Sequence, residues 1–518
     1  MDTPAQSLSP WADTAKRRLH PLSADASADV CIVGAGIAGL TTAYCLAQQQ
    51  VSVIVLDDGV IGGGETERTT AHITHALDDR YWWLEKIHGE ENAHLAAESH
   101  TAAIDFIDET VQKEKIGCAF MRLSGYLFLA GEDPVSILER ELEAIRRAGL
   151  SGVELLPQAP FQSFDTGSAL HFPDQGEFHV LQYLEGLVKA IEIRKGNVFT
   201  GTHVSDIEEQ PGGTWRIKTS GGNTVTAKSV VIATNAPVID NVRIYGQQSA
   251  YRTYVIAGTI PKGSVEKALF WDMPKARDSE RPVSYHYIRT AEHSTKEDLL
   301  IVGGEDHKTG QENRGPLHFS NLERWTRDRF PMMGELAYHW SGQVMEPFDG
   351  LAFIGRHPSS KKNLYITTGD SGNGMTHGTI AGMLLTDLIL ENSNPWEELY
   401  DPSRTRLKSG KEFLRGNANV ASVIGRDLFK KNPKRPEEAL ENDSGMVVRK
   451  GFKTRIALYR DVQGTLHKLS AVCPHKGCIV RWNSLEKSWD CPCHGSRFTA
   501  TGEVVNGPSI ENLKPLKH

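Results

Sequence analysis

Two cysteines and two histidines near the C-terminal end of the chain have the types and spacing of metal ligands. Cys473 and His475 form a Cys-x-His pair, and Cys491 and His494 form a Cys-x-x-His pair. Together they suit an iron-sulfur cluster with two thiolates on one iron and two imidazoles on the other. A structural zinc site of the Cys2His2 type uses the same ligands and is the alternative. Both interpretations predict a metal centre built from two loops.

The sequence around these ligands resembles the two cluster-binding loops of Rieske proteins. A proline follows the first cysteine of each loop, a glycine follows the ligands of each loop, and a serine comes next to the second glycine; these residues are Pro474, Gly477, Pro492, Gly495 and Ser496. The resemblance implies a Rieske 2Fe-2S cluster held by Cys473, His475, Cys491 and His494.

Three further positions of these loops are interpreted through the same resemblance. Cys478 and Cys493 resemble the pair that forms a loop-to-loop disulfide in Rieske proteins of respiratory cytochrome complexes, and two buried free thiols are the alternative. Ser496 resembles the hydroxyl that bonds a bridging sulfide there, whereas Phe498 stands where a tyrosine is usual. One hydrogen bond to the cluster should therefore be missing. We expect a reduction potential within the Rieske range of roughly −150 to +300 mV, but below its upper end.

A glycine motif near the N-terminus is typical of a dinucleotide-binding turn. It follows an apolar strand at residues 29–33 and opens a helix at residues 37–50, and a second strand ends at Asp57. The glycines permit a tight turn and a close approach of a pyrophosphate to the helix N-terminus, and the acid can accept ribose hydroxyls. The motif consists of Gly34, Ala35, Gly36, Ile37, Ala38 and Gly39.

Three separated segments resemble flavin-contacting parts of the glycine oxidase and D-amino-acid oxidase superfamily. They are residues 62–72, 230–237 and 363–376, and the resemblance covers about residues 28–395. It implies FAD, with Val204 as the adenine-side backbone contact. Beyond the glycine motif, the positions that we assign to FAD are Asp57, Asp58, Thr66, Arg68, Thr69, Thr70, Val204, Ala233, Thr234, Gly369, Gly372, Gly374, Met375 and Thr376.

Two details of these segments bear on the flavin. Arg68 stands where some relatives attach the flavin through a histidine, so noncovalent FAD is expected. A helix that starts at Met375 would direct its positive end at the pyrimidine edge of the flavin and stabilise the anionic reduced form. Only one complete dinucleotide motif is present, whereas reductases fed by NAD(P)H commonly carry two, so an organic substrate is the expected electron source.

From the helices and strands expected around these motifs, we predict an α/β Rossmann-like FAD-binding body with a mixed-sheet substrate domain. A small all-β Rieske domain is predicted to follow it. Helical spacing also covers residues 89–114 and 134–148, and strands with glycine and asparagine turns are expected from there to about 345. The predicted division is an N-terminal arm 1–27, a body 28–395, a basic linker 396–440 and a Rieske domain 441–518. Within the body, FAD-binding segments are about 28–90, 200–240 and 345–395, and the substrate domain is mainly 91–199 and 241–344.

Composition excludes several classes of function. The 518 residues carry a net charge of −8, so no general basic field favours nucleic acid. No apolar run approaches the roughly 20 residues of a membrane span, and no export signal is recognised. We expect a cytoplasmic protein without a transmembrane segment. Four of the seven cysteines lie in the two loops, which favours a metal centre over a disulfide framework.

Candidate catalytic residues follow from pattern alone. Tyr285, Tyr287 and Arg289 alternate along one face of a predicted strand, and a Tyr/Arg pair can clamp a carboxylate; a surface arginine beside packed tyrosines is the alternative. His72 and His377 adjoin flavin motifs, and His307 follows a Gly-Gly-Glu-Asp segment. For each histidine, a structural role is the alternative to catalysis.

These parts predict an FAD-dependent oxidoreductase acting on a C-N bond of an amine or amino acid. Electrons would pass from reduced flavin through the cluster to an unidentified acceptor, either a one-electron acceptor protein or a quinone. The alternatives are an amine oxidase that uses oxygen directly and keeps a structural or redox-sensing Rieske domain, an electron-transfer component fed by NAD(P)H, and a noncatalytic redox-responsive binding protein.

Overall fold

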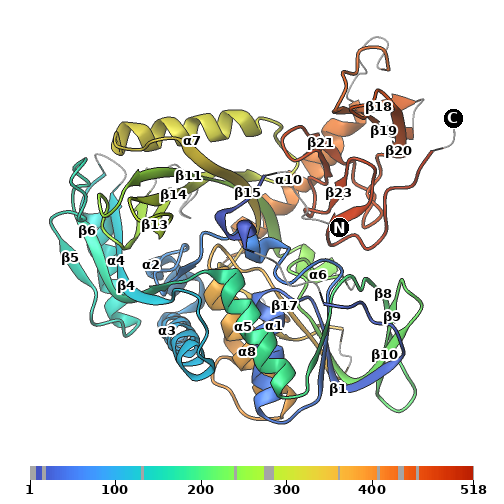
Figure 1. Ribbon diagram of the computed structural model, residues 1–518, viewed down its shortest axis with the longest axis horizontal. Coiled ribbons are helices and arrows are strands. Elements are labelled where there is room, and N and C mark those ends of the chain that lie inside the picture. The colour runs from blue at the N-terminus through green and yellow to red at the C-terminus, as the bar shows by residue number, and fades with distance from the viewer. Residues whose placement is uncertain are drawn as a thin grey trace.

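The computed structural model describes residues 7–14, 19–129, 133–238, 242–273, 285–359, 362–404, 409–429, 437–450 and 454–516. Two large sheets with their helices form the body, and a small all-β domain built from the C-terminal residues lies against it (Figure 1).

The first sheet has a parallel centre in the order β17-β10-β1-β2-β7, with β16 antiparallel at one edge and the hairpin β8-β9 beside β10. The inner strands are apolar on both faces, as parallel strands covered on both sides must be. Helices α1 (Ile37–Gln48), α5 (Val180–Ile193) and α8 (Gly374–Ile389) pack on one face. The strands are β1 (Ala26–Val33), β2 (Val53–Leu56), β7 (Asn197–Phe199), β8 (Val204–Glu209), β9 (Trp215–Thr219), β10 (Thr224–Ile232), β16 (Phe353–Arg356) and β17 (Leu364–Thr368).

The second sheet is mostly antiparallel, in the order β15-β11-β14-β13-β12-β4-β6-β3 with β5 beside β6. Helix α7 (Gly315–Arg329) covers one face, and α2 (Tyr81–His88), α3 (Glu90–Glu114) and α4 (Ser136–Arg147) lie on the other side (Figure 1). The strands are β3 (His72–Ile73), β4 (Met121–Leu129), β5 (Glu154–Leu156), β6 (Ala169–Glu177), β11 (Gln248–Pro261), β12 (Leu269–Met273), β13 (Tyr287–Glu292), β14 (Glu297–Lys308) and β15 (Leu336–Pro347).

The C-terminal domain contains two antiparallel sheets, β18-β19-β20 and β21-β22-β23-β24. Trp482, Trp489 and Phe498 share its core with the four loop cysteines. Helix α10 (Gly410–Phe429) connects it to the body. The strands are β18 (Ser444–Lys450), β19 (Thr454–Arg460), β20 (Leu466–Ser470), β21 (Arg481–Asn483), β22 (Ser488–Asp490), β23 (Arg497–Thr499) and β24 (Val504–Asn506).

The segment that precedes β1 lies on the body and reaches the C-terminal domain. Trp11, in the 3-10 turn η1 (Pro10–Asp13), donates from Nε1 to the backbone oxygen of Thr69 at 2.7 Å. Ser7 Oγ donates to Glu486 Oε1 at 2.9 Å. The segment therefore contacts both the body and the C-terminal domain.

The predicted fold class is confirmed, and the elements expected in one region are corrected. Strands with turns were expected from residue 149 to about 345, but α5 and α7 also lie there. Helix α5 buries apolar residues at helical spacing, whereas α7 buries Leu322 with the polar His318 and Thr326. The region predicted as a basic linker contains α9 (Glu397–Tyr400) and α10. Its Arg404 is buried in an ion pair with Asp349, with Nε 2.8 Å from Oδ2.

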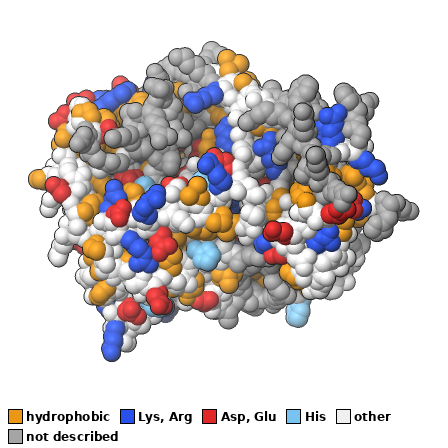
Figure 2. Space-filling model, turned by 90° about the horizontal axis from the view of Figure 1, so that it is seen from above, with side chains coloured by type: hydrophobic (Ala, Val, Ile, Leu, Met, Phe, Trp, Pro, Cys, Tyr) orange, Lys and Arg blue, Asp and Glu red, His pale blue; other side chains and the backbone are white. Residues whose placement is uncertain are grey.

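Two further features concern the apolar character of the described helices and the surface charge on one face. Within the described parts of the chain, no helix combines the length and the apolar composition needed to cross a membrane. On the face in Figure 2, the coloured acidic and basic side chains are interspersed with apolar ones and do not separate by charge.

Candidate cofactor, substrate and cluster sites

A cavity of about 580 Å³ runs from the carboxyl ends of β1, β2 and β10 to the second sheet. The glycine motif and the three other segments predicted to bind FAD line it, as do residues 504–507 of the C-terminal domain. A crevice outside the carboxyl ends of parallel strands is the usual place for a dinucleotide. The cavity therefore joins the predicted cofactor motifs to the C-terminal domain.

The glycine motif forms the turn between β1 and α1. Gly34 has φ +112°, and a Cβ there would lie 2.5 Å from the backbone oxygen of Ala233. A Cβ on Gly39 would lie 1.9 Å from the backbone oxygen of Gly34, so the helix packs on the turn only without a side chain. Gly34, Gly36, Ile37 and Ala38 line the cavity. The N-terminus of α1 thus faces a space that can accept a pyrophosphate.

Asp57 lines the cavity beside this turn. Its Oδ2 accepts the N-H of Ala35 at 2.7 Å and its Oδ1 accepts the N-H of Gly59 at 2.8 Å. Burial and the nearby Asp58 raise the pKa of Asp57 to about 6. Asp58 and Val204 line the same part of the cavity. Each carboxylate oxygen has a second lone pair, so this end fits the predicted ribose and adenine contacts.

The second predicted loop passes the middle of the cavity. Thr66, Arg68, Thr69 and Thr70 line it, and Thr66 Oγ1 accepts the N-H of Ile37 at 3.2 Å. The Arg68 guanidinium turns away and donates from Nη1 to the backbone oxygen of Ser341 at 2.7 Å.

Arg289, the expected carboxylate clamp, does not line the cavity. Its Nη1 donates to the backbone oxygens of Thr70 and Ala71 at 3.1 and 3.0 Å, and its Nη2 lies 3.1 Å from Glu177 Oε2. Arg289 therefore supports the second loop from behind.

The closing loop lies between β17 and α8. Gly369, Gly372, Gly374 and Met375 line the cavity with Ala233 and Thr234 of the segment after β10. Gly372 has φ +78°, and a Cβ there would lie 1.9 Å from Asp78 Oδ2. Thr376 does not line the cavity; its Oγ1 donates to the backbone oxygen of Asn373 at 3.2 Å and lies 2.7 Å from His100 Nδ1. The N-terminus of α8 opens on the cavity, as expected for a flavin-facing helix.

The part of the cavity next to the second sheet carries tyrosines and carboxylates. The Tyr285 hydroxyl donates to Asp78, and the Tyr287 hydroxyl lies 2.7 Å from Thr253 Oγ1. Asp306 lines the same region. Burial raises the pKa of Asp78 and of Asp306 to about 7. Two buried carboxylates with raised pKa values therefore lie in the wall of the cavity next to the second sheet.

The three candidate histidines have different places. His72 lines the cavity and contacts Thr70 Oγ1 at 2.9 Å, and burial lowers its pKa to about 3. His377 also lines it and donates from Nδ1 to the backbone oxygen of Asp370 at 2.8 Å; burial lowers its pKa to about 4. His307 lies outside the cavity lining, its ring stacked 4.8 Å from that of His318.

The two loops predicted to bind the cluster have the same backbone hydrogen bonds. In the first, Cys473 N-H donates to Cys478 O at 2.8 Å and Gly477 N-H donates to Cys473 O at 3.0 Å. In the second, Cys491 N-H donates to Ser496 O at 2.7 Å and Gly495 N-H donates to Cys491 O at 3.1 Å. The two loops therefore share one backbone conformation around their cysteines.

The ligand side chains converge between these loops. Cys473 and Cys491 are buried free thiols, and the rings of His475 and His494 are 5.1 Å apart. Nδ1 of His494 is buried and has no hydrogen-bond partner within the described chain, as a nitrogen reserved for a metal would be. These residues fit a cluster with two sulfur and two nitrogen ligands.

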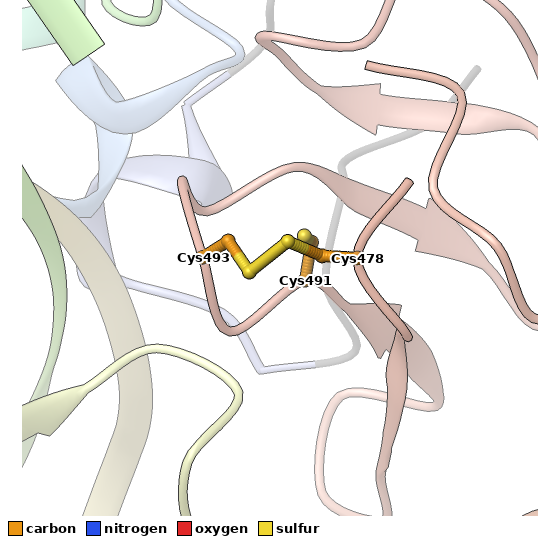
Figure 3. Close-up of side chains that lie close together, drawn as sticks. All are labelled: Cys478, Cys491 and Cys493. Carbon is orange, nitrogen blue, oxygen red and sulfur yellow. A yellow bond between two sulfur atoms is a disulfide. The ribbon is translucent and has the colours of Figure 1, made fainter. Parts of the chain in front are cut away.

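The other two loop cysteines form the disulfide implied by the resemblance, with Cα atoms 6.5 Å apart. Figure 3 shows Cys491 beside the Cys478–Cys493 bond. Because the disulfide occupies two of these three sulfurs, only Cys491 of the group can bind metal.

Residues of the body contact the cluster loops directly. The ring of Tyr245, in α6 (Val242–Tyr245), lies 4.6 Å from that of His475 and 5.7 Å from that of His494. Gln343 Nε2 donates to the backbone oxygen of Gly495 at 3.1 Å. The histidine side of the predicted cluster therefore faces the body.

Sequence reasoning missed Asp78, Asp306 and Tyr245. Asp306 directly precedes a histidine that was considered, so its neighbourhood was recognised but not the residue. Asp78 and Tyr245 belong to no motif, and only the folded chain brings them to these sites.

Comparisons with known proteins agree with both sites. The family model "FAD dependent oxidoreductase" matches residues 29–388, and "Rieske [2Fe-2S] domain" matches residues 432–517. The chain is 30% identical to the putative Rieske 2Fe-2S iron-sulfur protein YhfW of Bacillus subtilis, over 96% of this chain and 94% of that one.

Two further similarities each cover about seven tenths of the chain. Gamma-glutamylputrescine oxidoreductase of Escherichia coli is 26% identical over 71% of this chain and 85% of its own. Glycine oxidase from Geobacillus kaustophilus superposes with a TM-score of 0.59 and 19% identity, over 73% of this chain and 99% of that one, which shows a common fold.

Proposed function

Since the chain belongs to the FAD dependent oxidoreductase family and ends in a Rieske [2Fe-2S] domain, we propose that it oxidises a C-N bond and passes the electrons through the cluster. Its cofactors are FAD and a 2Fe-2S cluster. The observation that carries the proposal is the single cavity bounded by both the flavin loops and residues 504–507 of the Rieske domain. Two relatives named for an amine and an amino acid support the C-N bond.

The residues that line the cavity fit FAD along its length. The α1 N-terminus with Gly34 and Gly36 would hold the pyrophosphate, Asp57 the ribose, and the second and closing loops the ring system. Bound FAD supplies a hydride acceptor, and the cluster supplies one-electron transfer.

Residues of the chain must accept the proton that the substrate nitrogen loses. An ammonium substrate must lose a proton from nitrogen before its neighbouring carbon can give up a hydride, because the nitrogen lone pair forms the new C=N bond. Asp78 and Asp306, with pKa values near 7, are placed to take this proton. The imine then adds water and yields a carbonyl compound and an amine or ammonia. The two electrons leave singly to an acceptor protein or quinone.

The test is anaerobic mixing of the holoprotein with amines and amino acids. We expect bleaching of the flavin band, followed by the EPR signal of a reduced Rieske cluster. Cys473→Ser should keep FAD and substrate bleaching but lose reoxidation by a one-electron acceptor. Cys118→Ser, at a buried cysteine of the body, is the matched control.

Three outcomes would contradict the proposal. Undiminished oxygen-driven turnover in Cys473→Ser would identify an oxidase with a structural Rieske domain. Reduction of the cluster by NAD(P)H without any amine would identify an electron-transfer component. Failure of every amine and amino acid to bleach the flavin would favour a noncatalytic protein.

A further inference from the structure

Carboxylates from four separate elements lie near one another in the wall of the cavity, between the second sheet and the closing loop. Asp78 precedes α2, Asp306 lies on β14, Glu346 on β15, and Asp370 in the closing loop. Oδ1 of Asp306 and Oδ1 of Asp370 are buried and accept no hydrogen bond from the residues that the structure describes. A buried carboxylate oxygen without a donor is costly unless a ligand supplies one.

No side chain of the described lining balances this charge. Arg68 is the only arginine or lysine among the described residues that line the cavity, and its guanidinium is bonded to the backbone oxygens of Ser341 and Ser7. Arg289, behind the second loop, is paired with Glu177. The described lining therefore contains no lysine or arginine that is free to pair with a substrate carboxylate, and Arg80, whose guanidinium carbon lies 5.8 Å from the centre of the Tyr285 ring, does not line the cavity.

The carboxylates also act on one another. Burial raises the pKa of Asp306 and of Asp370 to about 7, and the neighbouring Glu346 adds to both effects. A bound cation would relieve this repulsion and supply hydrogen-bond donors to the free oxygens.

Aromatic rings complete the same region. The Tyr285 and Tyr287 rings lie 5.7 Å apart, and Trp271 and Tyr251 also line the cavity. Faces of tyrosine and tryptophan attract ammonium groups. The wall thus combines two features that favour a positive charge.

We propose that this cavity accepts a cationic amine without a carboxylate on the reacting carbon, and that it excludes α-amino acids. This inference rests on the proposed C-N oxidation and names its substrate class.

Matched pairs of compounds that differ only by the α-carboxylate test it. The probes are 1,4-diaminobutane against ornithine, and butylamine against norvaline. Binding is followed anaerobically by perturbation of the flavin spectrum and by the rise in thermal midpoint, and reduction by bleaching. We expect each amine to bind at least about tenfold more tightly than its amino acid.

Substitution of one carboxylate tests the cause. Asp306→Asn keeps the side-chain volume, and we expect it to weaken amine binding about ten- to hundredfold, since a hydrogen bond to a charged group is lost. Glu297→Gln, an exposed position on the same strand, should bind amines as the natural protein does. FAD content and thermal midpoint verify folding, and Asp78→Asn is the second variant if Asp306→Asn loses FAD.

The outcomes separate this inference from the proposed function. Amino acids that bind and bleach as well as the matched amines would overturn the inference and leave C-N oxidation standing. Unchanged amine binding in Asp306→Asn, or in Asp78→Asn where that variant replaces it, would also overturn it. Bleaching by neither class, with reduction by NAD(P)H, would overturn the proposed function itself.

Discussion

Ser496 offers a direct test of how the protein sets the cluster potential. The residue is completely buried at the end of the second cluster loop, and its Oγ accepts the N-H of Ser509 at 3.1 Å. As the resemblance to Rieske loops implies, we expect the hydroxyl to donate to a sulfur of the bound cluster. Reduction adds negative charge to the cluster and its sulfurs, so this hydrogen bond strengthens on reduction and favours the reduced state. Ser496→Ala should therefore lower the potential.

The size of the shift follows from the hydrogen bond. A bond to a charged group contributes about 1.5–3 kcal/mol, and if about half of this differs between the two redox states, the difference is about 0.8–1.5 kcal/mol. For one electron, about 59 mV corresponds to a tenfold change in equilibrium constant, or about 1.4 kcal/mol. We expect the midpoint potential to fall by about 30–65 mV.

The assay is a potentiometric titration of the holoprotein monitored by EPR. Thr501→Ala, which removes an exposed hydroxyl bonded to Thr499 and Glu503, is the control and should leave the potential unchanged. An intact cluster in Ser496→Ala with an unchanged or higher potential would refute the reasoning.

Three other parts of the structure give further predictions. Cys478→Ser removes a disulfide that spans 15 positions; we expect about 3 kcal/mol less stability of the domain and earlier loss of cluster absorbance on heating. Arg404→Met leaves Asp349 as a buried unpaired carboxylate, so the free energy of unfolding in urea should fall by about 3–5 kcal/mol. Burial raises the pKa of Asp349, but the positive charge of Arg404 has the larger effect and lowers this pKa from 3.8 to about 2. In thermal melts at acid pH, the stability that the Arg404–Asp349 pair contributes should be complete above about pH 4. It should be lost as the pH falls through 2, because Asp349 then takes up a proton. Tyr245→Ala uncovers the rings of both cluster histidines, and stopped-flow mixing with ferricyanide should show faster oxidation of the reduced cluster.

The sequence predicted best those sites whose residues lie close together along the chain. The glycine motif and both cluster loops each lie within six consecutive positions, and their backbone geometry follows from local residue types. The β-α-β unit was predictable for the same reason, because β2 is a continuous apolar run between turns. The second sheet was not, since β4 pairs with β6 on one side and with β12 on the other. Such long-range registers leave no local pattern.

The same distinction explains the substrate site. Arg289 lies on the expected face of its strand, but it forms an ion pair with Glu177 on a different strand of the sheet. Because of this ion pair, Arg289 is not available to bind a substrate carboxylate. Asp78 and Asp306 come from separate elements and meet only in the folded chain. A residue pattern predicted the tyrosines, whereas the carboxylates that surround them required the tertiary structure.

The contacts between body and Rieske domain bear on how an external acceptor can reach the cluster. Glu65, in the second flavin loop, accepts two hydrogen bonds. The backbone N-H of Gln343 donates to its Oε2 at 2.6 Å, and Nδ2 of Asn506 donates to its Oε1 at 2.9 Å. Arg252 of the body lies 3.8 Å from Asp490 of the Rieske domain, and their side chains are 1% and 2% exposed. Separation of the domains would break this ion pair together with the hydrogen bonds of Glu65 to Asn506 and of Gln343 to Gly495. We therefore expect the docked arrangement to persist through turnover, so that an acceptor protein or quinone meets the cluster in place.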